Sequence, residues 1–435
     1  MFKRFLVVAA TALMTATAFA QDVQDLDRRL KQLEEKIQKL QQTSETAELK
    51  REIDVLTQEI EALKTGQQHT AVEANQSQYG LGAAASKVYR SEPGVSFGGY
   101  GEFRYARPEN GIASADVVRA VLYTGYKFSN RAIFNSELEV EHGSTEFAGD
   151  ESRDAEGGSV SVEFAYLDYL LRPSANIRAG LVLLPTGLIN EQHEPTAYFG
   201  THRPEVEDRI LPTTWSELGA GVFGDVGTVS YRGYIVTGLQ SSRFSATDGV
   251  HEGKQGGASA AAEDLAVTGR IDWHPFEGTM FGGSIYSGGS GQGAGYRGRV
   301  TLGDVHADAK FRAVSLRALV ARGHIGDAAA ISGRVGETIG SSLGGWYAEG
   351  AYDLGAMLGR GNVSLSPYIR YERLDTQRRV AAGFERDPEN DRRITTFGLS
   401  FKPIPQTVIK TDWHRIKTGA GSSDNRFNIG LGYIF

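Results

Sequence analysis

The chain has 435 residues, and its 46 lysines and arginines against 53 aspartates and glutamates give a formal net charge of −7. A mildly acidic chain without a block of basic residues does not predict a nucleic-acid-binding protein. The absence of cysteine excludes disulfide bonds and thiolate chemistry, and the 54 glycines exceed the usual share, which suits strands that bend and approach closely.

Residues 1–20 have the pattern of a secretory signal peptide. Lys3 and Arg4 form a basic start, an apolar stretch follows, and Ala18 and Ala20 mark a small-residue cleavage site before Gln21. The stretch is too short for a membrane-spanning helix, and no later run approaches the roughly 18 apolar residues that such a helix needs. The sequence therefore predicts an exported protein that enters a membrane, if it does so, without helices.

Residues 21–65 carry apolar residues at alternating spacings of three and four, which predicts an α-helical coiled coil in the periplasm. A break near Ser44 leaves two alternatives open, a continuous rod or a helical hairpin. The apolar stripe is too narrow for a domain core, so the segment needs partner helices. The apolar positions are Val23, Leu26, Leu30, Leu33, Ile37 and Leu40, then Leu49, Ile53, Leu56, Ile60 and Leu63.

After a polar linker at 66–92, the apolar period changes to two, which is typical of β-strands with one apolar face. Val95, Phe97 and Phe103 share a face, with Glu102 and Arg104 opposite. Further strands repeat the pattern, with Val118, Ala120, Leu122, Tyr126 and Phe128 on one face, and with Phe427, Ile429, Leu431, Tyr433 and Phe435 ending the chain. The pattern predicts an all-β domain over residues 93–435.

Alternation alone also fits a large β-sandwich, so the lengths of the connections decide the fold. Short connections fall at 129–130, 173–175, 225–227, 275–278, near 313, at 355–361 and at 402–406. Long or polar ones fall near 107–115, 143–158, 186–218, 240–265, 287–298, 323–343, 374–391 and 417–425. Short turns at one end and long loops at the other are typical of an outer-membrane barrel. We predict a transmembrane antiparallel β-barrel of about sixteen strands, with its short turns and both termini on the periplasmic side.

Charged side chains on the faces opposite the apolar ones are the predicted pore lining, because side chains alone cannot fill a barrel of this size. Basic and acidic residues balance, which predicts compensating wall charges rather than a strong ion preference. The pore-lining candidates are Arg104, Arg119, Lys127, Arg178, Arg232, Arg270, Arg317, Arg370, Lys410, Glu137 and Glu139.

The connection at 186–218 is rich in charge and proline, and it also contains Tyr198, Phe199, Ile210 and Trp215. A long loop with apolar anchors is expected to pack against something, and the available surface in a porin is the inner wall. We therefore predict that this loop narrows the channel. Its candidate residues are Glu191, His193, Glu194, Arg203, Glu205, Glu207 and Arg209.

Two kinds of chemistry are weighed against the channel. His193, Glu194, His202 and Glu205 are of metal-ligating types, but their spacing matches no compact ligand motif, so no metal site and no cofactor are predicted. Carboxylate pairs such as Glu205 and Glu207 suit acid–base catalysis, yet no nucleophile motif accompanies them, so the chain is not predicted to be an enzyme.

The chain resembles the phosphate-selective porin O and P family. The resemblance lies in the signal peptide, the coiled-coil prefix and six stretches of the barrel, namely 95–103, 162–169, 177–181, 187–190, 203–215 and 219–224. It implies a sixteen-stranded homotrimer with a pore narrowed by a long loop and, in some members, an arginine ladder that binds phosphate. No such ladder can be placed here residue by residue, and the acidic strand with Glu137, Glu139 and Glu141 departs from an anion-collecting wall.

The sequence thus predicts an outer-membrane porin for passive diffusion of small hydrophilic solutes or ions, with anions such as phosphate as one class. The alternative is a structural tether that links the outer membrane to the cell wall through the coiled coil. Outer-membrane lipid and further copies of the chain are the other expected partners, with no nucleic acid. The coil leaves one tension, since isoleucine and leucine as at Ile53–Leu63 favour dimers, whereas the resemblance implies trimers.

Overall fold

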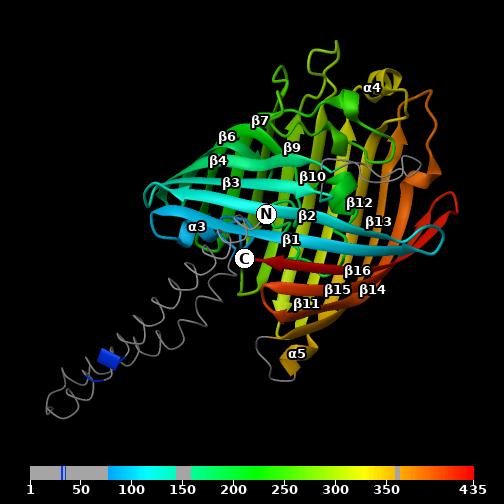
Figure 1. Cartoon of the computed structure of the whole chain (residues 1–435). Coiled ribbons are helices and arrows are strands. Elements are labelled where there is room, and N and C mark those ends of the chain that lie inside the picture. The colour runs from blue at the N-terminus through cyan, green and yellow to red at the C-terminus, as the bar shows by residue number, and fades with distance from the viewer. Residues whose placement is uncertain (1–30, 33–34, 36–76, 144–157, 358–362) are drawn as a thin grey trace, which may run out of the picture. The chain divides into compact units, whose positions relative to one another are not determined.

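The computed structural model describes residues 31–32, 35, 77–143, 158–357 and 363–435. Over these residues the chain forms a closed barrel of 16 strands, each antiparallel to the next, with β1 joined to β16 (Figure 1). The strands are β1 (Gly94–Pro108), β2 (Ser114–Lys127), β3 (Ala132–Glu141), β4 (Val160–Arg172), β5 (Ala175–Leu183), β6 (Ser216–Val226), β7 (Val229–Thr237), β8 (Leu265–Trp273), β9 (Thr279–Gly288), β10 (Val300–Phe311), β11 (Val314–Ile325), β12 (Gly340–Tyr352), β13 (Ser364–Val380), β14 (Asp391–Ile404), β15 (Thr407–Thr418) and β16 (Ser423–Ile434).

The predicted barrel and its strand number are confirmed, and the β-sandwich alternative is wrong. The expected short turns join neighbouring strands at one end of the barrel, and the expected long connections join them at the other end. Residues 144–157 and 358–362 of these connections lie outside the described residues. In Figure 1, α4 (Ala328–Val335) lies in a long connection at one end of the barrel, and α5 (Leu354–Met357) lies in a turn at the opposite end. The predicted signal peptide and most of the predicted coiled coil lie outside the described residues. Within the predicted coil, the structure describes Lys31, Gln32 and Glu35, which are helical.

Alternation places apolar side chains outside and polar ones inside, as a barrel in lipid requires. On β11 the outward Leu316 and Val320 are 56% and 49% exposed, whereas Leu319 and Ala321, at positions of the other parity, face inward and are buried. The barrel closes because β1 and β16 pair along nine residues, and Phe435 exchanges backbone hydrogen bonds of 3.1 and 2.9 Å with Gly99. Closure leaves no unpaired strand edge in the apolar band.

One residue on β2 faces the other way from its prediction. The register between β1 and β2 shifts between Glu102 and Phe103, because Val118 is an extra residue opposite them. The bulge turns Val118 inward, where it is buried, although the period-two pattern predicts it on the outer face with Leu122. Alternation does not reveal such a bulge, because the pairing with the neighbouring strand sets it. The bulge also shifts the parity of Val117, which lies opposite the outward Phe103.

The buried apolar core lies inside the barrel rather than between two sheets. Inward residues of the wall, such as Leu319 and Tyr347, pack with Val206, Ile210 and Trp215 of the connection between β5 and β6. The connection between β5 and β6 thus covers inward apolar residues of the wall, which the alternating pattern does not reveal.

The remaining helical segments are short. They are α3 (Lys87–Arg90), η1 (Val206–Ile210), η2 (Ser241–Arg243), η3 (His251–Gly253) and η4 (Pro388–Asn390). Among the described residues, none of the helices has the length and apolar character needed to cross a bilayer.

Candidate functional site: the lumen and its inward loop

Residues 184–215, which we call the inward loop, cross the lumen and are held by wall side chains that bind their backbone. Lys402 donates to Thr196 O at 2.8 Å, and Lys410 donates to Gly200 O at the same distance. Further wall side chains donate to loop carbonyl oxygens, namely Arg270 to Gly187 O, Arg317 to Ala197 O and Arg370 to His202 O. Glu372 and Asp304 accept from the backbone N–H groups of Val206 and Gly187. These contacts come from strands on several sides of the barrel, so they fix the loop across the lumen rather than against one wall.

Glu207 shapes the loop from within. Its buried carboxylate accepts hydrogen bonds from Leu188 N and from Ile189 N at 2.5 and 2.8 Å, and from the Tyr347 hydroxyl of β12 at 2.6 Å. Gly187 has a φ of 62°, and a Cβ at this position would collide with the same carboxylate. Glu207 therefore sets a tight turn at the start of the loop and joins it to the wall.

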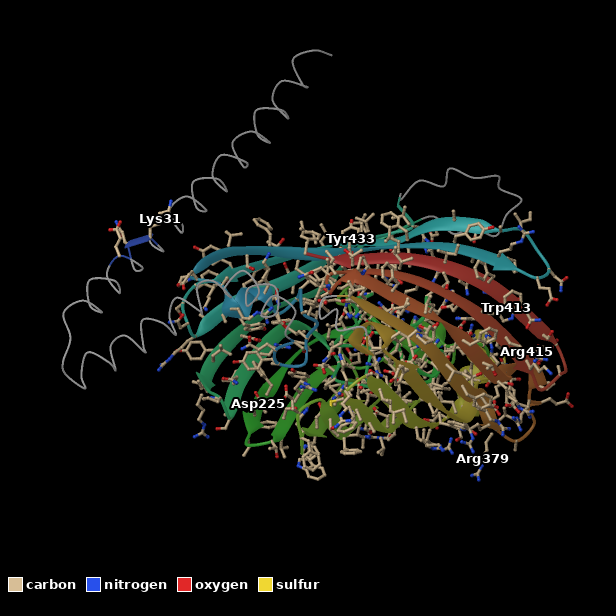
Figure 2. The ribbon with its side chains drawn as sticks, turned by 90° about the horizontal axis from the view of Figure 1, so that it is seen from below. Lys31, Asp225, Arg379, Trp413, Arg415 and Tyr433 are labelled. Atoms are coloured by element: carbon tan, nitrogen blue, oxygen red, sulfur yellow. The ribbon has the colours of Figure 1, made fainter. Side chains whose placement is uncertain are left out.

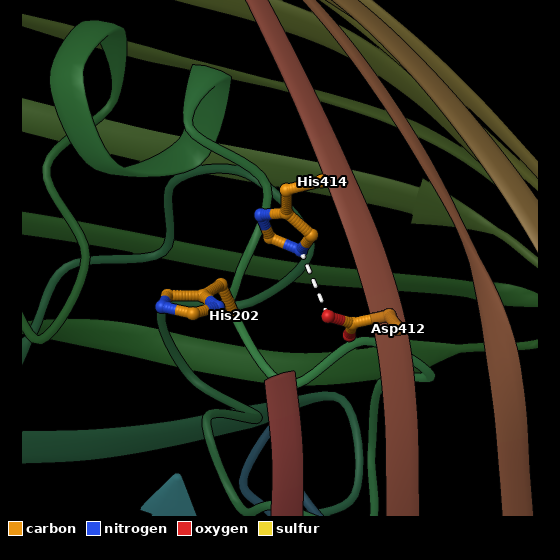
Figure 3. A group of neighbouring side chains, drawn as sticks. All are labelled: His202, Asp412 and His414. Atoms are coloured by element: carbon orange, nitrogen blue, oxygen red, sulfur yellow. Dashed lines mark ion pairs between the residues drawn. The ribbon is translucent and has the colours of Figure 1, made fainter. Parts of the chain in front are cut away.

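A second anchor joins the middle of the loop to β15. Both oxygens of Asp412 are engaged, by Thr201 N at 2.7 Å, Thr201 Oγ1 at 3.0 Å, the Tyr368 hydroxyl at 2.9 Å and Asn428 Nδ2 at 2.9 Å. Figure 3 shows His202 of the loop beside Asp412 and His414, with an ion pair of 3.3 Å between His414 and Asp412. Asp412 therefore acts as a clasp for the loop.

The same three residues are the group in the described chain that best suits a metal ion. One ligand atom from each of His202, Asp412 and His414 lies within 4.8 Å of the others. Imidazole and carboxylate suit transition metals, but the Asp412 carboxylate already accepts four hydrogen bonds within the protein. The geometry thus fits a hydrogen-bonded clasp at least as well as a cation site. The group differs from the one considered in the sequence, because His202 lies with Asp412 and His414 and not with His193, Glu194 and Glu205.

The loop divides the lumen into cavities. One of them, which we call the vestibule, has a volume of about 630 Å³ and is lined in part by residues of the long connections. A cavity of about 240 Å³, the turn-side cavity, is lined by Lys310, Arg317 and Lys402 near the short turns. Tyr198 of the inward loop lines both. Its hydroxyl donates to Glu102 at 2.9 Å, and Lys410 lies 3.7 Å from the centre of its ring.

Residues 77–92, which we call the entry segment, pack inside the lumen against the inward loop, although the sequence predicts a linker there. Ala84 N and Ala85 N donate to Glu194 Oε1 at 2.8 and 3.1 Å, and Asn135 Nδ2 donates to Ala85 O at 2.9 Å. Glu194 belongs to the inward loop, and burial raises its pKa to about 7. Beside the entry segment lies a further cavity of about 370 Å³, the side cavity, lined by Gly80, Arg232 and Arg270.

All the predicted pore-lining residues face inward, but not all of them reach open space. Arg104, Arg119, Arg370 and Glu139 line the vestibule, Arg317 lines the turn-side cavity, and Arg232 and Arg270 line the side cavity. The other four are covered. Lys127 donates to Tyr89 O and Ser91 O, Arg178 is fully buried with Asp168, Lys410 lies under Gly200, and Glu137 lies beside His193.

The predicted loop residues divide in the same way. Arg203, Glu205 and Arg209 line the vestibule. The other four are buried and hold the loop in place. Glu191 pairs with Arg232 at 3.0 Å, and His193 pairs with Glu137 at 3.1 Å. Glu194 accepts from the backbone of the entry segment, and Glu207 accepts from Tyr347. Charge in a loop does not distinguish these two roles, because both need polar side chains.

Three features of the lumen are absent from the sequence prediction. Tyr198 is predicted only as an apolar anchor, His414 is not singled out, and the entry segment is read as a linker. Two weak patterns in the sequence bear on these features. Asp412 and His414 have the same inward parity on one strand, which could have indicated a pair in the lumen. Val88 and Tyr89 are apolar within an otherwise polar stretch, which could have indicated that the entry segment is buried.

Acidic partners offset the arginines that face the lumen. Arg232 and Arg270 both bind Asp272, at 2.7 Å each, and Arg370 binds Glu372 at 2.8 Å and Glu349 at 3.3 Å. Around the vestibule, basic and acidic side chains occur in nearly equal numbers, together with His202, His251 and His414. The wall thus presents paired charges rather than an unbalanced ladder.

No family model matches the chain. It is 36% identical over 359 residues to an uncharacterised protein of Aquifex aeolicus strain VF5, covering 79% of this chain and 80% of that protein. Its fold is similar to that of Salmonella typhi OmpF in complex with daunomycin, with a TM-score of 0.53 and 14% identity over 78% of this chain and 97% of that one. It is also similar to the anion-selective porin from Comamonas acidovorans, with a TM-score of 0.50 and 11% identity over 79% and 100% of the two chains. At these identities the likeness shows the porin fold, and the narrower resemblance to phosphate-selective porins rests on the sequence stretches alone.

Proposed function

This chain belongs to the family of the Aquifex aeolicus protein, and from the geometry of its barrel we propose that it is an outer-membrane porin, a channel and not an enzyme. Small hydrophilic solutes would diffuse through it between the vestibule and the turn-side cavity. Both faces of the wall support this function, since the outer face is apolar and suited to lipid, and the inner face is polar and encloses cavities.

The observation that carries the proposal is the position of Tyr198. It is held by the inward loop between the two cavities and is fixed by Glu102 and Lys410. A solute on this route passes the Tyr198 ring and the Glu102 carboxylate, which line the vestibule, whereas Lys410 is buried against the ring. Because the arginines of the wall are paired with acids, we propose only weak selectivity between ions.

The test is planar-bilayer conductance of the refolded mature protein and of Tyr198→Ala. Discrete steps are expected from the wild-type protein, and larger steps from the variant, because removing the ring widens the narrowest point. Tyr169→Ala is the matched control, since Tyr169 is an outward tyrosine of β4 and 46% exposed. Equal steps from Tyr198→Ala and the wild-type protein would place the constriction elsewhere, and no steps from folded protein would end the porin proposal.

The phosphate question needs a separate measurement in the same bilayer. Under a salt gradient we expect a reversal potential close to zero, and phosphate at low concentration should leave the current unchanged, because acidic partners offset the lumen arginines. A current blocked by low phosphate would mean that these arginines converge on anions despite their partners.

The tether alternative rests on the heptads of residues 21–65, which lie almost entirely outside the described residues. It is compatible with a channel, since the coil precedes the barrel in the chain. Sedimentation of the mature protein with purified cell wall, compared with the protein lacking residues 21–65, tests it directly. Binding that needs the coil would add an anchoring role to the porin.

A further inference from the structure

The outer surface of the barrel carries a basic area at the ends of the strands next to the long connections, on β11 and on β13 to β15. Arg322, Arg373 and Arg393 point outward there and are exposed. Figure 2 places Arg379 and Arg415 toward the same end of the barrel as Trp413, and Asp225 toward the other end. We call this area the arginine face, and it consists of Arg322, Arg373, Arg378, Arg379, Arg386, Arg393, Arg415 and Lys417.

Pairing between strands brings like charges together on this face. Arg373 lies opposite Arg393, and Arg393 lies opposite Lys417, so three basic residues cross three neighbouring strands in a row. Like charges at directly opposite positions destabilise a sheet unless something compensates them. Among the described residues, Asp391 pairs with Arg373 at 3.5 Å and Asp375 pairs with Arg386, while Arg322, Arg393 and Lys417 have no acidic partner.

Several of these arginines line a hollow in the same face. Its volume is about 370 Å³, and its charged and aromatic lining consists of Arg322, Arg373, Arg378, Arg386, Trp346, Asp375 and Asp391. Four arginines against two aspartates leave the hollow with a net positive charge. Arginine forks bind phosphate oxygens in pairs. The hollow therefore suits a phosphate group next to an apolar or ring-shaped moiety, rather than an isolated ion in water.

The neighbourhood of the hollow indicates where such a group comes from. Trp346, Tyr371 and Trp413 lie next to the arginines on the same outward face, and Val320 and Ile369 follow farther from the long connections. Outward aromatic residues mark the boundary between the apolar core and the headgroups of a bilayer. The arginines thus lie at headgroup level. The acids that line the hollow, Asp391 and Asp375, are paired with Arg373 and Arg386. Among the described residues, Arg322 and Arg378 of the lining have no acidic partner and are the arginines left for a phosphate.

We infer that the arginine face binds the phosphate groups of a lipid headgroup in the leaflet on the side of the long connections. The placement in a bilayer rests on the proposed function, but solute passage and lipid binding are separate properties. The phosphates provide the charges that Arg322, Arg393 and Lys417 lack, and Trp346 packs against the sugar or acyl part of the same lipid. Bound lipid would then stabilise the row of like charges across β13, β14 and β15.

The experiment is native mass spectrometry of the full mature protein in detergent, titrated with diphosphoryl lipid A and with the same glycolipid after removal of its phosphates. The variant carries Arg322→Gln, Arg373→Gln and Arg393→Gln. The control carries Arg131→Gln and Arg172→Gln, which remove exposed arginines at the short-turn end. Retention of lipid A is expected to weaken about a hundredfold in the triple variant and to stay unchanged in the control. A melting curve of each variant shows that it is folded.

Each other outcome has a defined meaning. Equal retention of the glycolipid with and without phosphates, or by the wild-type protein and the triple variant, overturns the inference. Displacement of lipid A by millimolar inorganic phosphate would show that the arginines take free phosphate instead of a headgroup, which also overturns it. The bilayer conductance of the triple variant should match the wild type, so loss of lipid binding is distinguishable from failure of the channel.

Discussion

Arg178 and Asp168 form an ion pair inside the lumen that is almost completely shielded from water. Arg178 donates to both carboxylate oxygens at 2.8 and 2.9 Å, and its guanidinium lies 4.0 Å from the ring centre of Tyr166. The Tyr89 hydroxyl of the entry segment donates to the same carboxylate at 2.7 Å. Removing one partner of such a pair leaves an uncompensated buried charge, which costs far more than the pair itself contributes.

We therefore predict that Asp168→Ala lowers the free energy of unfolding by about 3–5 kcal/mol. Asp308→Ala is the matched control, because Asp308 also pairs with an inward arginine, Arg317, but their side chains are 33% and 16% exposed. Water screens that pair, so its loss should cost about 1 kcal/mol or less. Urea titration of both refolded variants, followed by tryptophan fluorescence, compares them, and equal losses would contradict the burial argument.

Glu194 gives a prediction that depends on pH. Burial raises its pKa to about 7 in the folded protein, from an ordinary value of 4.5. Between these two values the folded state holds a proton that the unfolded state has released, so the free energy of unfolding should fall as the pH rises from about 4.5 to about 7. The contribution is full below 4.5 and is lost above 7, and it amounts to at most about 3 kcal/mol.

Burial also raises the pKa of Glu207 in the same loop, so the test compares variants. The difference in unfolding free energy between wild type and Glu194→Gln should change across this window, because glutamine binds no proton. Glu252→Gln is the control, since that side chain is 64% exposed. A difference curve that is flat for Glu194→Gln would mean that the carboxylate is already solvated or paired.

At the scale of elements, the strands and turns could be predicted from the sequence, whereas their fine register could not. Alternation and the lengths of connections are local properties, and both survive in the barrel. Val118 shows the limit, because a bulge is decided by the partner strand and not by the residue itself. The partners of the inward loop are not predictable from local pattern, since Asp412 of β15, which accepts from Thr201 N, is 211 residues away along the chain.

The entry segment gives the clearest prediction at this scale. It fills lumen space beside the inward loop, with Leu81 and Val88 buried and Glu194 bound to its backbone. Replacing residues 77–92 by a glycine–serine linker of equal length should raise single-channel conductance, since it frees space on the short-turn side of the loop. The control is the same kind of replacement in residues 66–76. Unchanged conductance after replacing 77–92 would show that solutes do not pass near this segment.

At the scale of the whole molecule, the sequence predicts a homotrimer with a periplasmic coil. Contacts between barrels and contacts between coils could each hold the trimer together, and the two can be tested separately. The barrel presents apolar side chains outward on β1 to β5, including Phe97, Leu122 and Ile177, and this face can pack against another barrel as readily as against lipid. The coil would then hold together chains that the barrels already join.

We expect native mass spectrometry of the mature protein to give a trimer, and the protein lacking residues 21–65 to remain trimeric but to dissociate at a lower temperature. The reason is that the coil adds contacts in water, whereas the barrels would supply the assembly in the membrane. Replacing the apolar heptad residues Leu26, Leu30 and Leu33 by serine is the matched control, since it keeps the length of the prefix and removes its seam. Dimers from the full chain would mean that the isoleucine–leucine pattern of the coil sets the number of copies, and monomers from the shortened chain would mean that the coil alone holds the assembly together.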